Sequence, residues 1–201
     1  MRNCIIAFGL LIILSVGAAA QSHELGFVGG GKFTPSGTSP TGQTKVNSSF
    51  GFEVSYANQL ISGRVADLEL EVPIVAVPNS RLNATTNSVF TAKSYSSLYF
   101  LPGLRVRLGT HAPLSPWAAA GVGLVHFSPS STNLGGGPSG ANSSTKAGFD
   151  VGGGVDVRFG KSPLALRGEI RELYTGVPNL AVPKLSMHNN FLAGGGIVLR
   201  F

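Results

Sequence analysis

The chain has 201 residues, with 15 Lys and Arg against 9 Asp and Glu, which gives a formal charge of +6 at neutral pH. After residue 20, no apolar run approaches the roughly 20 residues that a membrane-spanning helix needs, so a helical membrane protein is excluded. A basic balance is typical of nucleic-acid binding, but the export predicted next argues against a nucleic-acid partner.

Residues 1–20 are typical of a signal peptide. Arg2 supplies the positive start, residues 5–16 form the apolar core, and three alanines precede a predicted cut at Gln21. No cysteine lies at the cut, and Cys4 leaves with the signal, so no lipid anchor, disulfide or thiol chemistry is expected. Residues 21–201 then form one predicted domain, with 14 basic against 9 acidic residues and a formal charge of +5.

Eight segments of this domain alternate between apolar and polar residues, which is the period of a β-strand. Long connections rich in Ser, Thr, Asn, Gly and Pro alternate with short ones. These features predict an all-β fold, an eight-stranded antiparallel up-and-down transmembrane β-barrel with both chain ends on the periplasmic side. The predicted strands cover 23–33, 48–59, 64–77, 96–109, 115–128, 146–159, 163–174 and 188–201, and the long connections cover 34–47, 78–95, 129–145 and 175–187.

Alternation also fits a soluble β-sandwich, in which the apolar face packs inward and charges scatter over the surface. The charges favour the barrel, because eight of the nine acidic residues and seven basic ones lie on the face opposite the apolar side chains. This near balance predicts a lumen plugged by ion pairs. The predicted lumen charges are Glu53, Asp67, Glu69, Glu71, Arg105, Arg107, Asp150, Asp156, Arg158, Arg167, Glu169, Arg171 and Arg200, with Glu24 and Lys32 from the first strand.

Glycine and aromatic residues give two further predictions. Gly-Gly-Gly occurs at 29–31, 152–154 and 194–196, and such triplets permit the tight curvature of a small barrel. The first and last triplets are expected on either side of the seam where the barrel closes. Aromatic residues near strand ends predict girdles at the two membrane interfaces, formed by Phe33, Tyr99, Trp117, Phe127, Tyr174 and Phe201.

The segment His126-Phe127-Ser128 resembles the His-x-Ser element of the outer-membrane lipid A deacylases, which use a Ser, a His and an acid. Pro129 and Ser130 replace the polar residues that usually follow, and Glu53 and Asp150 are the candidate acids. Strand parity predicts Phe127 toward lipid, and His126 with Ser128 inward.

We therefore predict no catalytic activity, with deacylase-like use of Ser128 and His126 as the alternative. No cofactor and no metal are expected, because the histidines have no metal-ligand spacing.

The final strand, 188–201, has one nearly continuous apolar face and carries Arg200 on the other. Its end resembles the C-terminal assembly signal of bacterial outer-membrane barrels, at Gly196, Leu199 and Phe201. The chain as a whole resembles the small eight-stranded outer-membrane barrel superfamily that includes the OmpA transmembrane domain and OmpX-like proteins. Segments 25–33, 115–123 and 166–171 and the Phe201 terminus carry this resemblance.

The resemblance implies a structural, adhesive or small-pore role in a Gram-negative outer membrane, and no common catalytic residues. We expect a monomer that contacts outer-membrane lipids and lipopolysaccharide and engages the barrel assembly machinery through its last strand. Its specific role is expected in the four extracellular loops, with a narrow pore as an alternative. The loop charges are all basic, which suits anionic phosphates or simple solubility at an anionic surface, and they are Lys45, Arg81, Lys93, Lys146 and Lys184.

Overall fold

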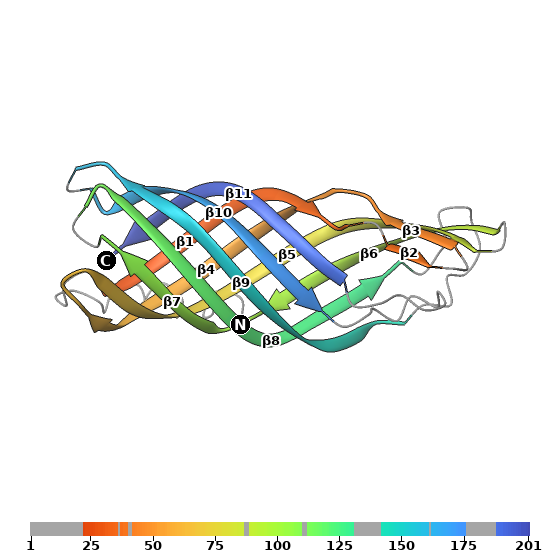
Figure 1. The fold of residues 1–201 in the computed structure, drawn as a ribbon, viewed down its shortest axis with the longest axis horizontal. Helices are drawn as coiled ribbons and strands as arrows, with labels where there is room; N and C mark the ends of the chain where they lie inside the picture. The colour runs from red at the N-terminus through yellow and green to blue at the C-terminus, as the bar shows by residue number, and fades with distance from the viewer. Residues whose placement is uncertain are drawn as a thin grey trace, which may run out of the picture.

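The computed structural model describes residues 22–35, 37–39, 42–86, 89–109, 112–130, 142–160, 162–175 and 188–201. The predicted signal peptide, residues 1–20, lies outside the described residues. In the part of the chain that is described, no helix is long and apolar enough to cross a bilayer. Figure 1 shows the strands wound as a tilted tube, with a few of them running on past one end.

The described strands form one antiparallel sheet that closes on itself, because β1 pairs with β4 on one side and with β11 on the other. Eight positions run around the barrel, since β6 and β7 share one position and are separated at Leu101 and Pro102. The predicted eight-stranded antiparallel barrel is therefore confirmed. The bounds are β1 His23–Phe33, β2 Gly37–Ser39, β3 Gly42–Val46, β4 Ser49–Ser62, β5 Ala66–Thr86, β6 Val89–Phe100, β7 Gly103–Leu108, β8 Leu114–Pro129, β9 Ser144–Arg158, β10 Leu164–Thr175 and β11 His188–Arg200.

Two predicted loops were partly wrong. Within 78–95, residues 78–86 continue β5 and 89–95 belong to β6, with a register shift between Val77 and Ser80. The segment 34–47 contains the β2–β3 hairpin, which pairs with β5. These segments are polar on both faces, so they lack the alternation that identifies a strand inside a bilayer. We call the end that carries β2 and β3 the loop end, and the opposite end the terminal end. The sequence predicts that the loop end is extracellular.

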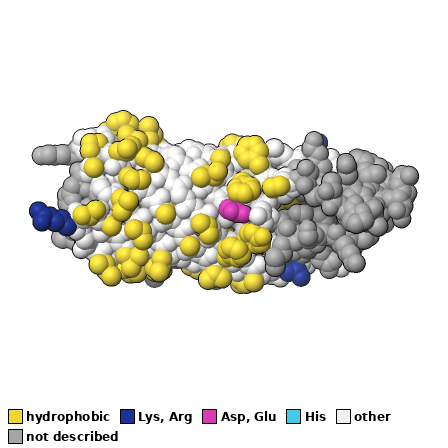
Figure 2. All heavy atoms as spheres, in the orientation of Figure 1, with side chains coloured by type: hydrophobic (Ala, Val, Ile, Leu, Met, Phe, Trp, Pro, Cys, Tyr) yellow, Lys and Arg dark blue, Asp and Glu magenta, His cyan; other side chains and the backbone are white. Residues whose placement is uncertain are grey.

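The outer wall of the barrel is apolar. Exposed side chains include Phe52, Leu98, Leu104, Leu124 and Ile170, and Figure 2 shows hydrophobic side chains spread over the visible surface of the barrel. Water would disfavour so much exposed apolar surface, whereas lipid chains accept it. The apolar face of the alternating segments therefore points outward, as the barrel prediction requires.

The predicted aromatic girdles are only partly correct. Phe33 is exposed, and Tyr174 stacks on Phe149 with ring centroids 4.7 Å apart. Tyr99, Trp117 and Phe127 instead lie inside the barrel, at 0%, 4% and 2% exposure. Both faces of β8 are apolar, so hydropathy alone does not decide which face points inward.

The seam between β1 and β11 is built from glycine. Gly29 pairs with Gly195 and Gly30 with Gly194, which confirms that the first and last triplets lie on either side of the closure. A Cβ added at Gly30 would overlap the carbonyl oxygen of Ala193 and would lie 2.7 Å from the Cα of Gly194. The two strands approach so closely that no side chain fits between them there.

We expect Gly30→Val to destabilise the closed barrel, because the added carbons clash with the backbone of β11. Gly168→Val is the matched control, since an added Cβ at Gly168 has no atom within 4 Å. The measurement is the folded fraction, read from the mobility difference between boiled and unboiled samples on a gel, over a urea series. Equal urea midpoints for the two variants would contradict this account of the seam.

Candidate functional site

The carboxylate of Glu24 lies at the centre of a charged layer inside the barrel. It forms ion pairs with Arg105 at 2.5 Å, Arg107 at 2.9 Å, Arg167 at 2.6 Å and Arg200 at 3.0 Å. The four guanidinium groups come from β7, β10 and β11, so one side chain of β1 ties together strands from around the barrel. Every one of these residues is buried.

Neighbouring strands supply the other acids of this layer. Glu69 lies opposite Arg105, and its carboxylate pairs with Arg105 and Arg107, each at 2.5 Å. Asp156 lies opposite Arg167 and binds it at 2.8 Å, and it binds Arg200 at 2.6 Å. Cross-strand neighbours on one face are close enough to interact, so the sequence pattern creates these pairs as soon as the register is set.

Trp117 lies among three of these guanidinium groups. Its ring centroid is 4.9 Å from Cζ of Arg167, 5.2 Å from that of Arg171 and 5.5 Å from that of Arg105. Its Nε1 donates to Oδ1 of Asp156 at 3.3 Å. The face of an indole ring attracts cations, so Trp117 packs the layer and spaces its like charges.

Glycines of β9 make room for this packing. A Cβ at Gly154 would lie 2.7 Å from Cζ2 of Trp117, and one at Gly152 would lie 2.7 Å from Cγ of Arg171. Sequence reasoning missed the role of Trp117. The sequence did contain a signal for this role, because Gly154 of the middle glycine triplet lies directly opposite Trp117 and leaves space for its ring.

A second charged layer surrounds Arg171, nearer the loop end. Four carboxylates pair with this guanidinium, from Glu71 at 2.7 Å, Asp150 at 2.9 Å, Glu53 at 3.0 Å and Glu169 at 3.5 Å. Only Glu71 also reaches a second arginine, Arg105, at 3.2 Å. Both carboxylate oxygens of Glu53 and of Glu169 are buried without a hydrogen bond. This layer therefore has more carboxyl groups than guanidinium groups.

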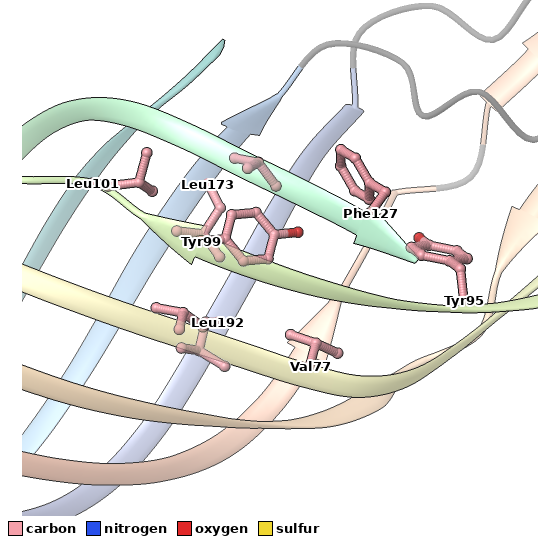
Figure 3. Packing of buried hydrophobic residues seen from close by; sticks show 9 residues of the cluster. Val77, Tyr95, Tyr99, Leu101, Phe127, Leu173 and Leu192 are labelled. Atoms are coloured by element: carbon pink, nitrogen blue, oxygen red, sulfur yellow. The ribbon is translucent and has the colours of Figure 1, made fainter. Parts of the chain in front are cut away.

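An apolar cluster fills the interior beyond the second layer, toward the loop end. Figure 3 shows its side chains pointing into the barrel from opposite walls. Alternation in the sequence does not reveal this cluster, because the strand segments that carry it are apolar on both faces. The members are Val75, Val77, Tyr95, Tyr99, Leu101, Val125, Phe127, Leu173 and Leu192. Lys32 borders the cluster, with its ammonium 5.5 Å from the ring centroid of Tyr95 and 3.4 Å from Oγ of Ser80.

The structure describes all of the predicted lumen residues. Arg158 is half-buried and has interactions of its own, and the others are buried: Glu53, Asp67, Glu69, Glu71, Arg105, Arg107, Asp150, Asp156, Arg167, Glu169, Arg171 and Arg200. Gly196 and Leu199 lie in β11, paired with Val28 and Leu25 of β1. The assembly role of these two residues and of Phe201 stays a prediction.

The predicted orientation of the His-x-Ser segment was wrong. His126 and Ser128 are exposed on the outer wall, and Phe127 is buried in the apolar cluster. Inside the barrel, the ring centroids of Phe127 and Tyr95 lie 6.1 Å apart.

The hydrogen-bond neighbour of His126 is a neutral side chain. Its Nδ1 lies 2.9 Å from Oγ1 of Thr145, on the neighbouring strand β9. The two candidate acids, Glu53 and Asp150, are buried inside the barrel and paired with Arg171, so the wall separates them from His126. Among the described residues, no group of three or more His, Cys, Asp or Glu side chains is arranged to hold a metal ion.

The predicted loop cations are partly in strands. Arg81 in β5 and Lys146 in β9 are exposed at the loop end. Lys45 lies in β3 and Lys93 in β6, and Lys184 lies outside the described residues. Glu172 is the one acidic residue of the described chain that is not in the interior, and it accepts a hydrogen bond from Nδ2 of Asn189 at 2.7 Å.

The two charged layers should respond differently when one of their carboxylates is neutralised. We expect Glu24→Gln to lower the free energy of unfolding by about 3–5 kcal/mol, since it leaves several buried guanidinium groups short of a partner. Glu53→Gln should be much milder or stabilising, because it removes one of the four carboxyl groups around Arg171 and keeps the side-chain shape. Urea unfolding in lipid vesicles gives the free energy of unfolding of the wild type and of both variants. Equal losses for the two would contradict the proposed difference between the layers.

Known proteins share this architecture. A family model described as the outer membrane protein beta-barrel domain matches residues 6–194. Neisserial surface protein A (NspA) superposes with a TM-score of 0.57 at 15% identity, over 92% of this chain and 100% of that one. OprG from Pseudomonas aeruginosa superposes with a TM-score of 0.52 at 10% identity, over 90% of this chain and 97% of that one.

At such low identity these two structures show the fold alone, and no curated protein sequence matches the chain. The family match covers most of the chain, and it agrees with the apolar outer wall and the closed sheet. This chain therefore belongs to the outer membrane protein beta-barrel domain family and resides in the outer membrane.

Proposed function

We propose that this protein is a non-catalytic membrane scaffold with a plugged lumen, and that its specific work is done at the loop end, outside the cell. The observation that carries the proposal is the interior itself. Two layers of ion pairs and an apolar cluster occupy it in sequence from the terminal end to the loop end. An eight-stranded barrel is only wide enough inside for side chains to fill.

Ion conduction needs a continuous path of water, and the interior side chains oppose one. Glu24 joins four arginines from three other strands, and Arg171 gathers four carboxylates. Opening a path would separate buried charge pairs, each of which is costly to break. The apolar cluster adds a second barrier, because apolar constrictions exclude water.

We therefore expect no steady conductance when the purified barrel is reconstituted into a planar lipid bilayer. A large porin in the same bilayers serves as the positive control, and the gel mobility of the unboiled sample verifies that the inserted protein is folded. Steady, reproducible conductance steps would refute the plugged lumen and favour the narrow-pore alternative.

The proposed partners are the lipids and lipopolysaccharide of the outer leaflet, with the protein as a monomer. Arg81 and Lys146 are exposed at the loop end, and cations there attract the phosphates of an anionic surface. During biogenesis, the proposed partner is the barrel assembly machinery, contacted through β11.

A deacylase-like enzyme is the second candidate, and one observation favours it. His126 and Ser128 face outward, where an enzyme acting on a lipid needs them. A serine nucleophile also requires a base that is oriented by a third group, usually an acid. The partner of His126 is Thr145, and no described carboxylate orients the ring. We therefore propose that the chain is not an enzyme.

Lipid analysis decides between the two. Membranes that contain the wild-type protein or Ser128→Ala should hold lipid A with the same acyl chains, because neither protein cleaves them. Loss of an acyl chain with the wild type, abolished in Ser128→Ala, would instead establish Ser128 as a nucleophile with His126 as its base.

A further inference from the structure

The outer wall carries an open hollow of about 430 Å³ at the loop end, over β5, β6 and β8. It is lined by Pro78 and Asn79 of β5, by Ser94, Tyr95 and Ser96 of β6, and by Ser128, Pro129 and Ser130 at the end of β8. The register shift between Val77 and Ser80 places the extra residues of β5 here, and such bulges commonly redirect side chains. Most of its hydroxyl groups lie on the outer side of the wall, because Ser94, Ser96 and Ser128 alternate with the buried residues Tyr95, Ser97 and Phe127, and Tyr95 also lines the hollow.

The hollow begins where the lipid-facing surface ends. Leu98 and Leu124 are about half-exposed on the apolar wall, and Ser96 and Ser128 follow them toward the loop end on the same face. Ser96 and Ser128 lie opposite each other, two residues beyond Leu98 along β6, and a rise of about 3.4 Å per residue puts them about 7 Å beyond it along the strand. The polar layer of a bilayer is about 5–8 Å thick on each side, so the hollow lies at head-group level.

The chemistry of the hollow is neutral and rich in hydroxyl groups. No acidic or basic side chain lines it, and its serine and asparagine side chains both donate and accept hydrogen bonds. Ser96 donates only a long hydrogen bond, 3.4 Å, to the carbonyl oxygen of Ser128. Acyl chains would leave these groups unsatisfied, whereas a sugar offers hydroxyl groups to them and C–H faces to the two prolines.

One cation borders the hollow. Arg81 lies directly opposite Ser94 in the β5–β6 ladder and is exposed. Since Ser80 is buried and side chains alternate along a strand, Arg81 points to the outer side, as the hollow does. A guanidinium at this position suits a phosphate group attached to the bound sugar.

We infer that the hollow binds the head group of a phosphorylated glycolipid, with the hydroxyl groups of Ser96 and Ser128 toward the sugar and Arg81 toward its phosphate. The inference rests on the proposed function, since it assumes that the loop end contacts the outer leaflet. It deepens that proposal, because it replaces general attraction by a cationic surface with a defined site for one class of lipid.

The test measures lipid binding to the folded full-length barrel in detergent by native mass spectrometry. The probes are a phosphorylated diglucosamine lipid, the same lipid without phosphate, and phosphatidylglycerol, which has a phosphate but no sugar. We expect the wild type to bind the phosphorylated glycolipid best and phosphatidylglycerol least. Ser96→Phe, which fills the hollow, should weaken both glycolipids by roughly tenfold and leave phosphatidylglycerol unchanged. Arg81→Gln should weaken only the phosphorylated form.

Matched controls come from the terminal end. Ser62→Phe and Arg64→Gln change an exposed serine and an exposed arginine there, and should leave the binding of all three lipids unchanged. Ser128→Phe fills the same hollow from β8, so it replaces Ser96→Phe if that variant lacks the mobility shift of a folded barrel.

Glycolipid binding that persists unchanged in folded Ser96→Phe or Ser128→Phe would overturn the site. If that binding still falls with added salt, the cationic loop end of the proposed function stands while the hollow does not. Equal wild-type affinity for phosphatidylglycerol and the phosphorylated glycolipid would also overturn the site, because it would remove any role for the sugar.

Discussion

A buried charge in a membrane protein is costly unless a group of opposite charge lies beside it. The interior of this barrel is organised by that requirement. Glu24 meets it with four arginines, from strands that are distant in sequence. The layer around Arg171 meets it incompletely, since four carboxylates share one guanidinium. The first layer therefore ties several strands together, whereas the second has more carboxyl groups than its guanidinium can pair fully.

Packing such large side chains into a narrow barrel requires space, and glycine supplies it. Gly152 and Gly154 lie against Arg171 and Trp117, so the middle triplet serves the interior as much as the curvature of β9. The glycines of β1 and β11 serve a different need, since they let two backbones approach closely at the seam. One sequence motif therefore has two physical uses, which depend on the strand that carries it.

The outer wall changes character along its length. The apolar surface that suits lipid chains gives way, within a few residues, to the hydroxyl groups of Ser96 and Ser128 and the exposed guanidinium of Arg81. The interior changes in the same direction, from ion pairs to the apolar cluster. These two changes, in the side chains that occupy the interior and in the chemistry of the outer rim, are the support for the proposed role of the loop end.

Local alternation in the sequence was enough to predict the number of strands around the barrel, the lipid-facing side of most of them and a set of charged residues for the lumen. Where one face of a strand carries charged side chains, only the other face can contact lipid. The parity of β8 could not be predicted in this way, because both of its faces are apolar; in the folded barrel Phe127 lies inside, near Tyr95, and His126 lies outside. The partners of Glu24 and the hollow over β5, β6 and β8 also required the fold, since ion pairs and concave surfaces depend on strands that meet only when the barrel closes.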